Sequence, residues 1–223
     1  MTHYPFPDGR GTKIAFAAFF TAMLFLARDS MFTTAVIGFE KAQFLMLGVI
    51  CLMGVAFLIV NRRKLPQILK DRRMIVAGVA AAVLLLPMLV KRDWQLMYFS
   101  VLLCLLTAVL LSYFLTVREA AKYYVAILSV LGAYSVLAAY ILRIGVDKGV
   151  YAVPVFQNSM GFEFHNFFLS IVPDTYVKNR NFGIFREPGV YQFFLITALY
   201  LNNYEVEWKK AWQLWLVNGI LAA

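Results

Sequence analysis

Long, unbroken blocks of apolar residues set the strongest limit on what this chain can fold into. Blocks of roughly 17–25 such residues match the hydrocarbon thickness of a bilayer, where a helix satisfies its own backbone polar groups. Hydrophobic residues make up 62% of the 223 residues and charged residues 15%. Soluble domains are about 45–50% apolar and about 25% charged. The sequence therefore predicts an all-α polytopic membrane protein.

The blocks predict a helical bundle of about six or seven transmembrane helices. A last block begins near position 211 and is cut off at the end of the chain. We therefore interpret the sequence as the truncated front part of a longer molecule. The preceding spans are predicted at 14–27, 42–60, 74–90, 96–117, 123–142 and 190–204.

Three parts follow from this pattern. Residues 1–142 hold the first five spans, and residues 190–223 hold the sixth span and the start of the seventh. Residues 143–189 form a long extracytoplasmic loop, rich in aromatic residues, where a disordered linker would be poor in them. Connections beyond about 15 residues are usually functional or disordered, so this loop is expected to be ordered and functional. Within it, 164–172 is too short to span and is expected to lie in the interface or to form a short helix over the bundle.

The basic residues predict the orientation of the chain. The net charge is +9, and the 61–73 connection carries six Lys and Arg residues against one Asp. Cytoplasmic loops are enriched in Lys and Arg, so this connection and the N-terminus are predicted to be cytoplasmic. No basic helix or aromatic RNA-reading motif accompanies the charge, so nucleic acid is not an expected partner.

The most specific local pattern lies where the long loop meets the sixth span. Arg180 and Arg186 flank Gly183, and Glu187 precedes Pro188. Proline is favoured at the first helical position, so the run predicts a turn that leads into a helix. A helix N-terminus favours anions, and the guanidinium fork matches phosphate oxygens. The pattern indicates a phosphate or diphosphate ligand at the outer face. The alternative is that both arginines merely lie at the interface or pair with Glu187 and Asp174.

The run RNFGIFREPGVYQFF resembles the signature of the O-antigen ligase and O-antigen polymerase family, multi-helix bacterial enzymes of surface polysaccharide assembly. The five spans before a long outer loop are similar as well. Family members usually continue with further spans and a second outer loop bearing a functional His or Arg, so we expect the general base in a C-terminal part beyond this sequence. The matching elements are Arg180, Gly183, Phe185, Glu187 and Pro188.

The resemblance implies glycosyl transfer on the extracytoplasmic face of the bacterial cytoplasmic (inner) membrane. The donor would be a glycan on undecaprenyl diphosphate, and the acceptor a glycan, lipid or protein, with no cofactor and no metal. Membrane lipid is the other expected partner. Arg180 and Arg186 would stabilise the departing diphosphate, while Glu187 would orient Arg186 or act as a base. Gly183, Tyr191 and His165 are the expected substrate-binding residues.

Other residues leave alternatives open. His165 is either a polar loop residue or a base, and Glu163 and Asp174 are candidates for contacts with sugar hydroxyls. Cys51 and Cys104 lie in apolar blocks without disulfide or metal spacing, as small buried hydrophobic residues do.

A transporter or flippase of lipid-linked glycans is the alternative function, but the first five spans carry no ionisable residue near their centres apart from Cys and Tyr. A non-catalytic scaffold would not need a charged, aromatic outer loop.

Overall fold

The computed structural model divides the chain into two compact units. Unit 1 comprises Met1–Ala22 with Glu40–Ala120, and unit 2 comprises Met23–Phe39 with Ala121–Ala223. The predicted parts 1–142, 143–189 and 190–223 concern membrane topology, and they stay a prediction. The residues that the structure describes are 10–27, 30, 37–64, 66, 70–92, 96–157, 161–174, 181–185, 187–206, 213, 217 and 219–220.

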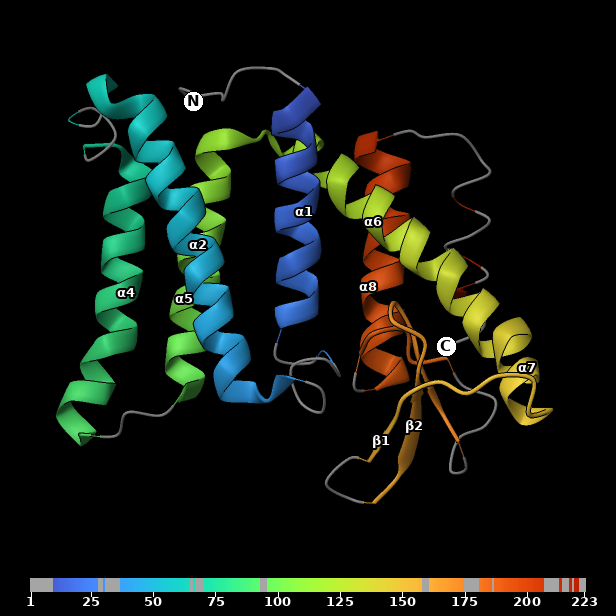
Figure 1. The fold of residues 1–223 in the computed structure, drawn as a ribbon. Coiled ribbons are helices and arrows are strands. Elements are labelled where there is room, and N and C mark those ends of the chain that lie inside the picture. The colour runs from blue at the N-terminus through green and yellow to red at the C-terminus, as the bar shows by residue number, and fades with distance from the viewer. Residues whose placement is uncertain are drawn as a thin grey trace. The chain divides into compact units, whose positions relative to one another are not determined.

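Helices make up unit 1 in the described part of the chain (Figure 1). They coincide within a few residues with the first four apolar blocks of the sequence, because a continuous apolar segment bonds its own backbone most completely as a helix. A 3₁₀ turn at Arg62–Lys64 follows the second helix. The helices are α1 (Arg10–Leu26), α2 (Phe39–Asn61), α4 (Arg72–Lys91) and α5 (Leu96–Phe114).

Helix α4 has defined ends and an apolar surface. The Asp71 carboxylate caps its N-terminus by accepting from the Arg73 backbone N–H, and Arg92 ends it in a left-handed conformation at φ 50°. Many of its large apolar side chains are exposed, among them Val83 at 64% and Val90 at 74%, whereas Met88 is buried. Burying such side chains is strongly favourable, so this exposure fits a helix surrounded by lipid better than one surrounded by water.

One continuous helical segment runs from α6 (Val117–Leu137) through a π-helical turn (Ala138–Leu142) into α7 (Arg143–Asp147). It begins with a capping box, in which the Thr116 N–H donates to the Glu119 carboxylate and the Glu119 N–H donates to the Thr116 hydroxyl. Figure 1 shows the three pieces as a single long coil. The predicted fifth span, 123–142, is therefore part of a longer helical segment.

Two helices of the described residues are long and apolar enough to cross a membrane, namely Arg72–Lys91 with 20 residues and Val117–Asp147 with 31. Two shorter apolar helical stretches, Gly11–Leu26 and Lys41–Ala56, accompany them. The chain is thus mostly helical with two candidate membrane-spanning helices.

Part of the predicted outer loop is a small antiparallel sheet in the order β1-β2-β3. Val155 pairs with His165, and His165 in turn pairs with Val172. The expectation of a short helix over 164–172 is wrong, because a turn with Phe168 at φ 65° folds this stretch back on itself. The strands are β1 (Val155–Gln157), β2 (Glu163–Asn166) and β3 (Ile171–Pro173).

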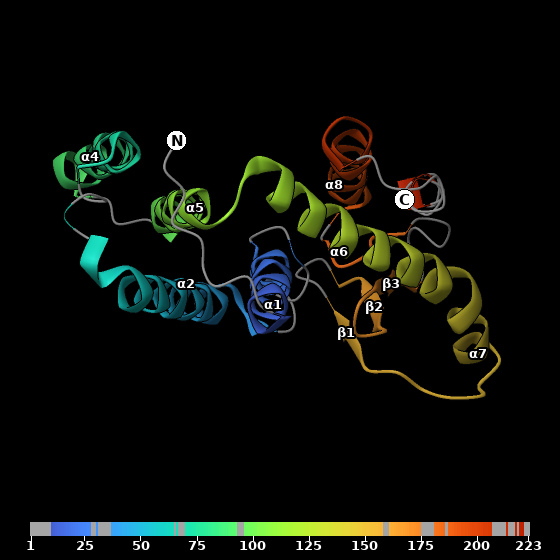
Figure 2. The ribbon, with the colours of Figure 1, turned by 90° about the horizontal axis from the view of Figure 1, so that it is seen from above.

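The sheet and α8 pack against the long helical segment inside unit 2. Phe167 and Val172 pack on Ala138, so the hairpin lies against the π-helical turn, as Figure 2 also shows. Helix α8 (Pro188–Leu201) continues into a second π-helical turn, Asn202–Val206. Its buried Tyr191 and Leu195 share a core with Val125 and Leu128 of α6. Of the seventh span, only positions 213, 217 and 219–220 lie within the described residues.

Candidate functional site at the start of α8

The loop Asn181–Phe185 and Glu187 lead into α8 as the sequence predicts. Pro188 stands at the first turn of the helix, where its missing N–H removes no helical hydrogen bond. Arg180 and Arg186, the predicted catalytic arginines, lie outside the described residues. The structure therefore describes the residues on both sides of Arg186, from Asn181 to Phe185 and from Glu187 onward.

Gly183 is required at its position by backbone geometry and by space. Its φ is +55°, in the left-handed region that favours glycine. A Cβ atom at this position would lie 2.8 Å from Cζ of the Tyr191 ring. Gly183 and Tyr191, both predicted to bind substrate, are buried against one another. Substrate binding by them stays a prediction, and their packing gives them a role in positioning the loop.

A buried chain of hydrogen bonds connects the loop to two helices. The Asn181 amide Nδ2 donates to the Ser135 hydroxyl at 2.7 Å, and the Ser135 and Tyr191 hydroxyls lie 2.7 Å apart. The Gly183 N–H donates to Asn181 Oδ1 at 2.9 Å, which closes an Asx turn. Because Ser135 lies on α6 and Tyr191 on α8, this network sets the position of the loop relative to both helices.

Backbone contacts hold the other side of the loop. The Ile171 N–H of β3 donates to the Gly183 carbonyl at 2.6 Å. Ser30 forms a β-bridge with Phe185, and its hydroxyl donates to the Ile184 carbonyl at 3.4 Å. The Phe185 ring stacks on that of Phe194, with centroids 4.4 Å apart. The loop is thus hydrogen-bonded to β3 and to Ser30, and it packs on α8 through the Phe185 ring.

Glu187 occupies the N-cap position of α8 with extended backbone, at φ −136° and ψ 141°. Its carboxylate makes no side-chain cap hydrogen bond, and the residue is exposed. Its carbonyl accepts the Tyr191 N–H at 3.2 Å, which begins the helix. The positive end of the α8 dipole therefore opens beside an exposed carboxylate, next in sequence to Arg186.

His165 belongs to a separate cluster on the hairpin. Its Nε2 lies 3.4 Å from Asp174 Oδ1, and the Arg143 guanidinium donates to the Asp174 carbonyl at 3.0 Å. The neighbouring Phe164 packs on Phe182 of the loop. Successive side chains of a strand point to opposite faces, so His165 faces away from that contact. The structure thus joins Gly183 and Tyr191 but does not bring His165 to them.

The sequence does not predict the roles of Ser135 and Asn181, two residues that hold the loop in position. Ser135 lies within an apolar block, and nothing in its surroundings signals a contact 46 residues away with Asn181. The turn at Asn181 could have been predicted from the sequence, because an Asn two residues before a Gly is typical of an Asx turn. Within the described part of the chain, no group of three or more His, Cys, Asp or Glu residues is placed to hold a metal ion.

Comparison of the chain with family models, with curated proteins and with solved structures gives no match.

Proposed function

We propose that this chain is part of a membrane glycosyltransferase of the O-antigen ligase and polymerase type. The observation that carries the proposal is the run from Arg180 to Gln192, whose described part forms a constrained loop at the start of an apolar helix. Gly183 and Pro188 each occupy a position that requires or favours their residue type, and Glu187 places a carboxylate at the positive end of the α8 dipole. Such a frame suits side chains that must be held in place for catalysis.

The proposed reaction transfers a glycan from undecaprenyl diphosphate to an acceptor hydroxyl. The hydroxyl oxygen forms a bond to the anomeric carbon, and its proton passes to a base. The bond from that carbon to the diphosphate breaks, and its electron pair stays on the diphosphate. Arg180 and Arg186 stabilise the negative charge that develops there, assisted by the α8 dipole, and Glu187 orients Arg186. Removing such a contact costs about 3–4 kcal/mol, or two to three decades in rate.

The proposal places the chain in the bacterial cytoplasmic membrane as a bundle of six or seven spans. Helices α1, α2, α5 and α8 would cross the membrane in addition to the two candidate spans. The apolar character of these helices supports the arrangement. The N-terminus would be cytoplasmic and the Asn181–Phe185 loop extracytoplasmic, as the distribution of Lys and Arg favours.

Complementation with the complete gene tests the proposal. Arg180→Ala and Arg186→Ala are expected to abolish glycan transfer, while Lys148→Ala, an exposed cation of the same predicted loop, leaves it intact. Each variant is also assayed in membranes with a labelled glycan on undecaprenyl diphosphate. Full polymer or conjugate formation by both arginine variants would refute the proposal. Movement of the labelled lipid across liposomes without bond formation would favour the transporter or flippase alternative.

A further inference from the structure

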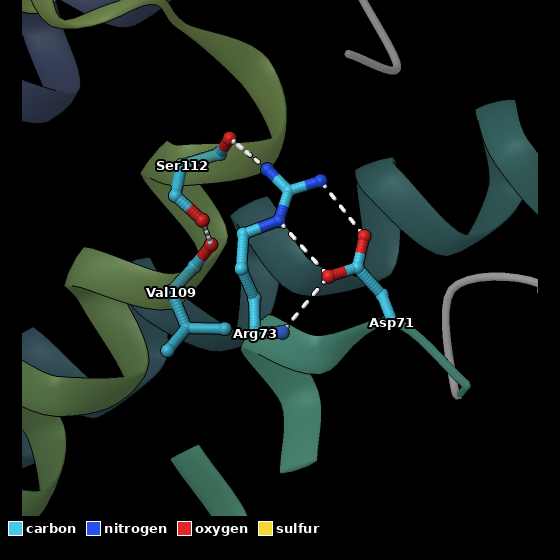
Figure 3. A network of polar contacts seen from close by, with 4 residues as sticks. All are labelled: Asp71, Arg73, Val109 and Ser112. Atoms are coloured by element: carbon cyan, nitrogen blue, oxygen red, sulfur yellow. Dashed lines mark hydrogen bonds and ion pairs between the residues drawn. The ribbon is translucent and has the colours of Figure 1, made fainter. Parts of the chain in front are cut away.

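A polar clamp joins the start of α4 to the end of α5 within unit 1 (Figure 3). Arg73 Nε and Nη2 donate to the two Asp71 carboxylate oxygens at 3.1 and 2.9 Å, and Nη1 donates to the Ser112 carbonyl at 2.6 Å. The guanidinium carbon lies 4.1 Å from the centroid of the Tyr113 ring. The clamp therefore fixes the separation of the two helices at this end.

A groove of about 720 Å³ begins at the clamp and continues between the two helices. This volume falls within the range of roughly 300–1,000 Å³ that small-molecule sites occupy. Two of its wall residues are alanines, which leave the space open. At 1.5 Å per helical residue, the wall along α5 from Leu105 to Ser112 extends about 10 Å. Its apolar walls are Val76, Ala77, Leu105, Ala108 and Val109.

The end of the groove at the clamp carries a positive charge. Asp71 and Arg73 neutralise one another through their ion pair, at 2.9 Å. Arg72 also lines the groove and is exposed, and within the described residues no carboxylate pairs with it. Lys70, next to Asp71, is exposed as well. The groove is thus apolar between the two helices and cationic at the end next to the clamp.

We propose that this groove binds an anionic membrane phospholipid. The phosphate lies at Arg72 and Lys70, and an acyl chain lies along the apolar walls between α4 and α5. The ligand must be anionic at one end and apolar over at least 10 Å, and basic pockets between membrane helices bind such headgroups. The inference rests on the proposed membrane placement of α4 and α5, but not on the proposed glycosyl transfer.

Native mass spectrometry of the full chain in neutral detergent tests the site. Phosphatidylglycerol and phosphatidylcholine with identical acyl chains are added at equal concentrations, and phosphatidylglycerol is expected to remain bound preferentially. Arg72→Gln is expected to weaken its retention about fivefold, the typical effect of one basic residue near a membrane surface. The matched control is Arg92→Gln at the other end of α4, which is expected to change nothing.

A second pair of variants tests the groove itself. Ala77→Leu fills the groove and is expected to reduce phosphatidylglycerol retention, whereas Ala82→Leu adds the same volume to an exposed position of α4 outside it. Equal retention of the two lipids, or equal losses for Arg72→Gln and Arg92→Gln, would overturn the proposal. Displacement of the lipid by millimolar inorganic phosphate would show an anion site without an acyl groove. A change from dimer to monomer in Ala77→Leu, with lipid retention unchanged, would identify a second copy as the occupant.

Discussion

The hydroxyl groups of Ser135 and Tyr191 lie 2.7 Å apart and join α6 to α8 inside unit 2. Both residues are fully buried, and the Asn181 amide donates to the same Ser135 oxygen. A buried polar group is costly when it loses its partner, so the three side chains depend on one another. The start of α8 is thereby tied to a residue in the middle of a long helix.

Tyr191→Phe is expected to lower the free energy of unfolding by about 1–2 kcal/mol, because it removes a buried hydrogen bond and keeps the ring. Thermal unfolding in detergent measures the effect. Tyr200→Phe is the matched control, since Tyr200 lies on the same helix and is exposed. Equal stability of the two variants would contradict the assigned network.

Gly183→Ala is expected to destabilise the chain by about 1–3 kcal/mol, because its Cβ overlaps the Tyr191 ring and its φ is positive. Gly189→Ala provides the control, as no atom lies within 4 Å of a Cβ there. Tyr191→Leu in the Gly183→Ala background is expected to relieve the overlap and to make the two changes non-additive. Strict additivity of the two unfolding free energies would argue against the contact.

The Asp71 clamp is expected to lose its contribution to stability in acid. Hydrogen bonds from the Arg73 side chain and backbone hold the pKa of the Asp71 carboxyl below its usual range. A carboxyl with a depressed pKa in the folded state stabilises the fold above its unfolded pKa, near 4, and this stabilisation fades as pH falls through the folded pKa. Unfolding of Asp71→Asn is therefore expected to depend less on pH below 4 than unfolding of the unmodified chain. Glu163→Gln removes an exposed carboxylate that belongs to no ion pair among the described residues, and it serves as the control.

Arg186→Lys is expected to restore little of the transfer activity lost in Arg186→Ala, because an ammonium group lacks the planar donor fork that fits a diphosphate. Rates with a labelled lipid-linked glycan are compared for the two variants. A transfer rate of Arg186→Lys within about threefold of the unmodified protein would show that a positive charge alone suffices at position 186. Glu187→Gln is expected to reduce the rate less than Arg186→Ala, since the orienting carboxylate does not contact the leaving group.

The orientation of the chain predicts where single cysteines react. With Cys51 and Cys104 replaced by serine, Lys148→Cys is expected to react with an impermeant maleimide in intact cells. Lys70→Cys is expected to react only after the membrane is opened, because the 61–73 connection is predicted to be cytoplasmic. Labelling of Lys70→Cys in intact cells would reverse the predicted topology.

The positions of the helices follow largely from the sequence, because long apolar segments have few alternatives to helix. Helices α4 and α5 begin and end within about three residues of the predicted spans, and Pro188 marks the start of α8. The hairpin over Glu163–Pro173 was missed. Its strands are only three or four residues long, too short for alternation to distinguish them from a short helix.

The sequence by itself determined that apolar helices dominate this chain, and that a glycine and a glutamate precede a helix that begins at Pro188. Those features depend on residue type and on neighbours within a few positions. Only the tertiary structure showed that Ser135 and Tyr191 hold the Asn181–Phe185 loop, and that Arg73 bonds to Ser112. Contacts between residues 39 to 56 positions apart arise when helices pack, and no local pattern encodes which side chains then meet.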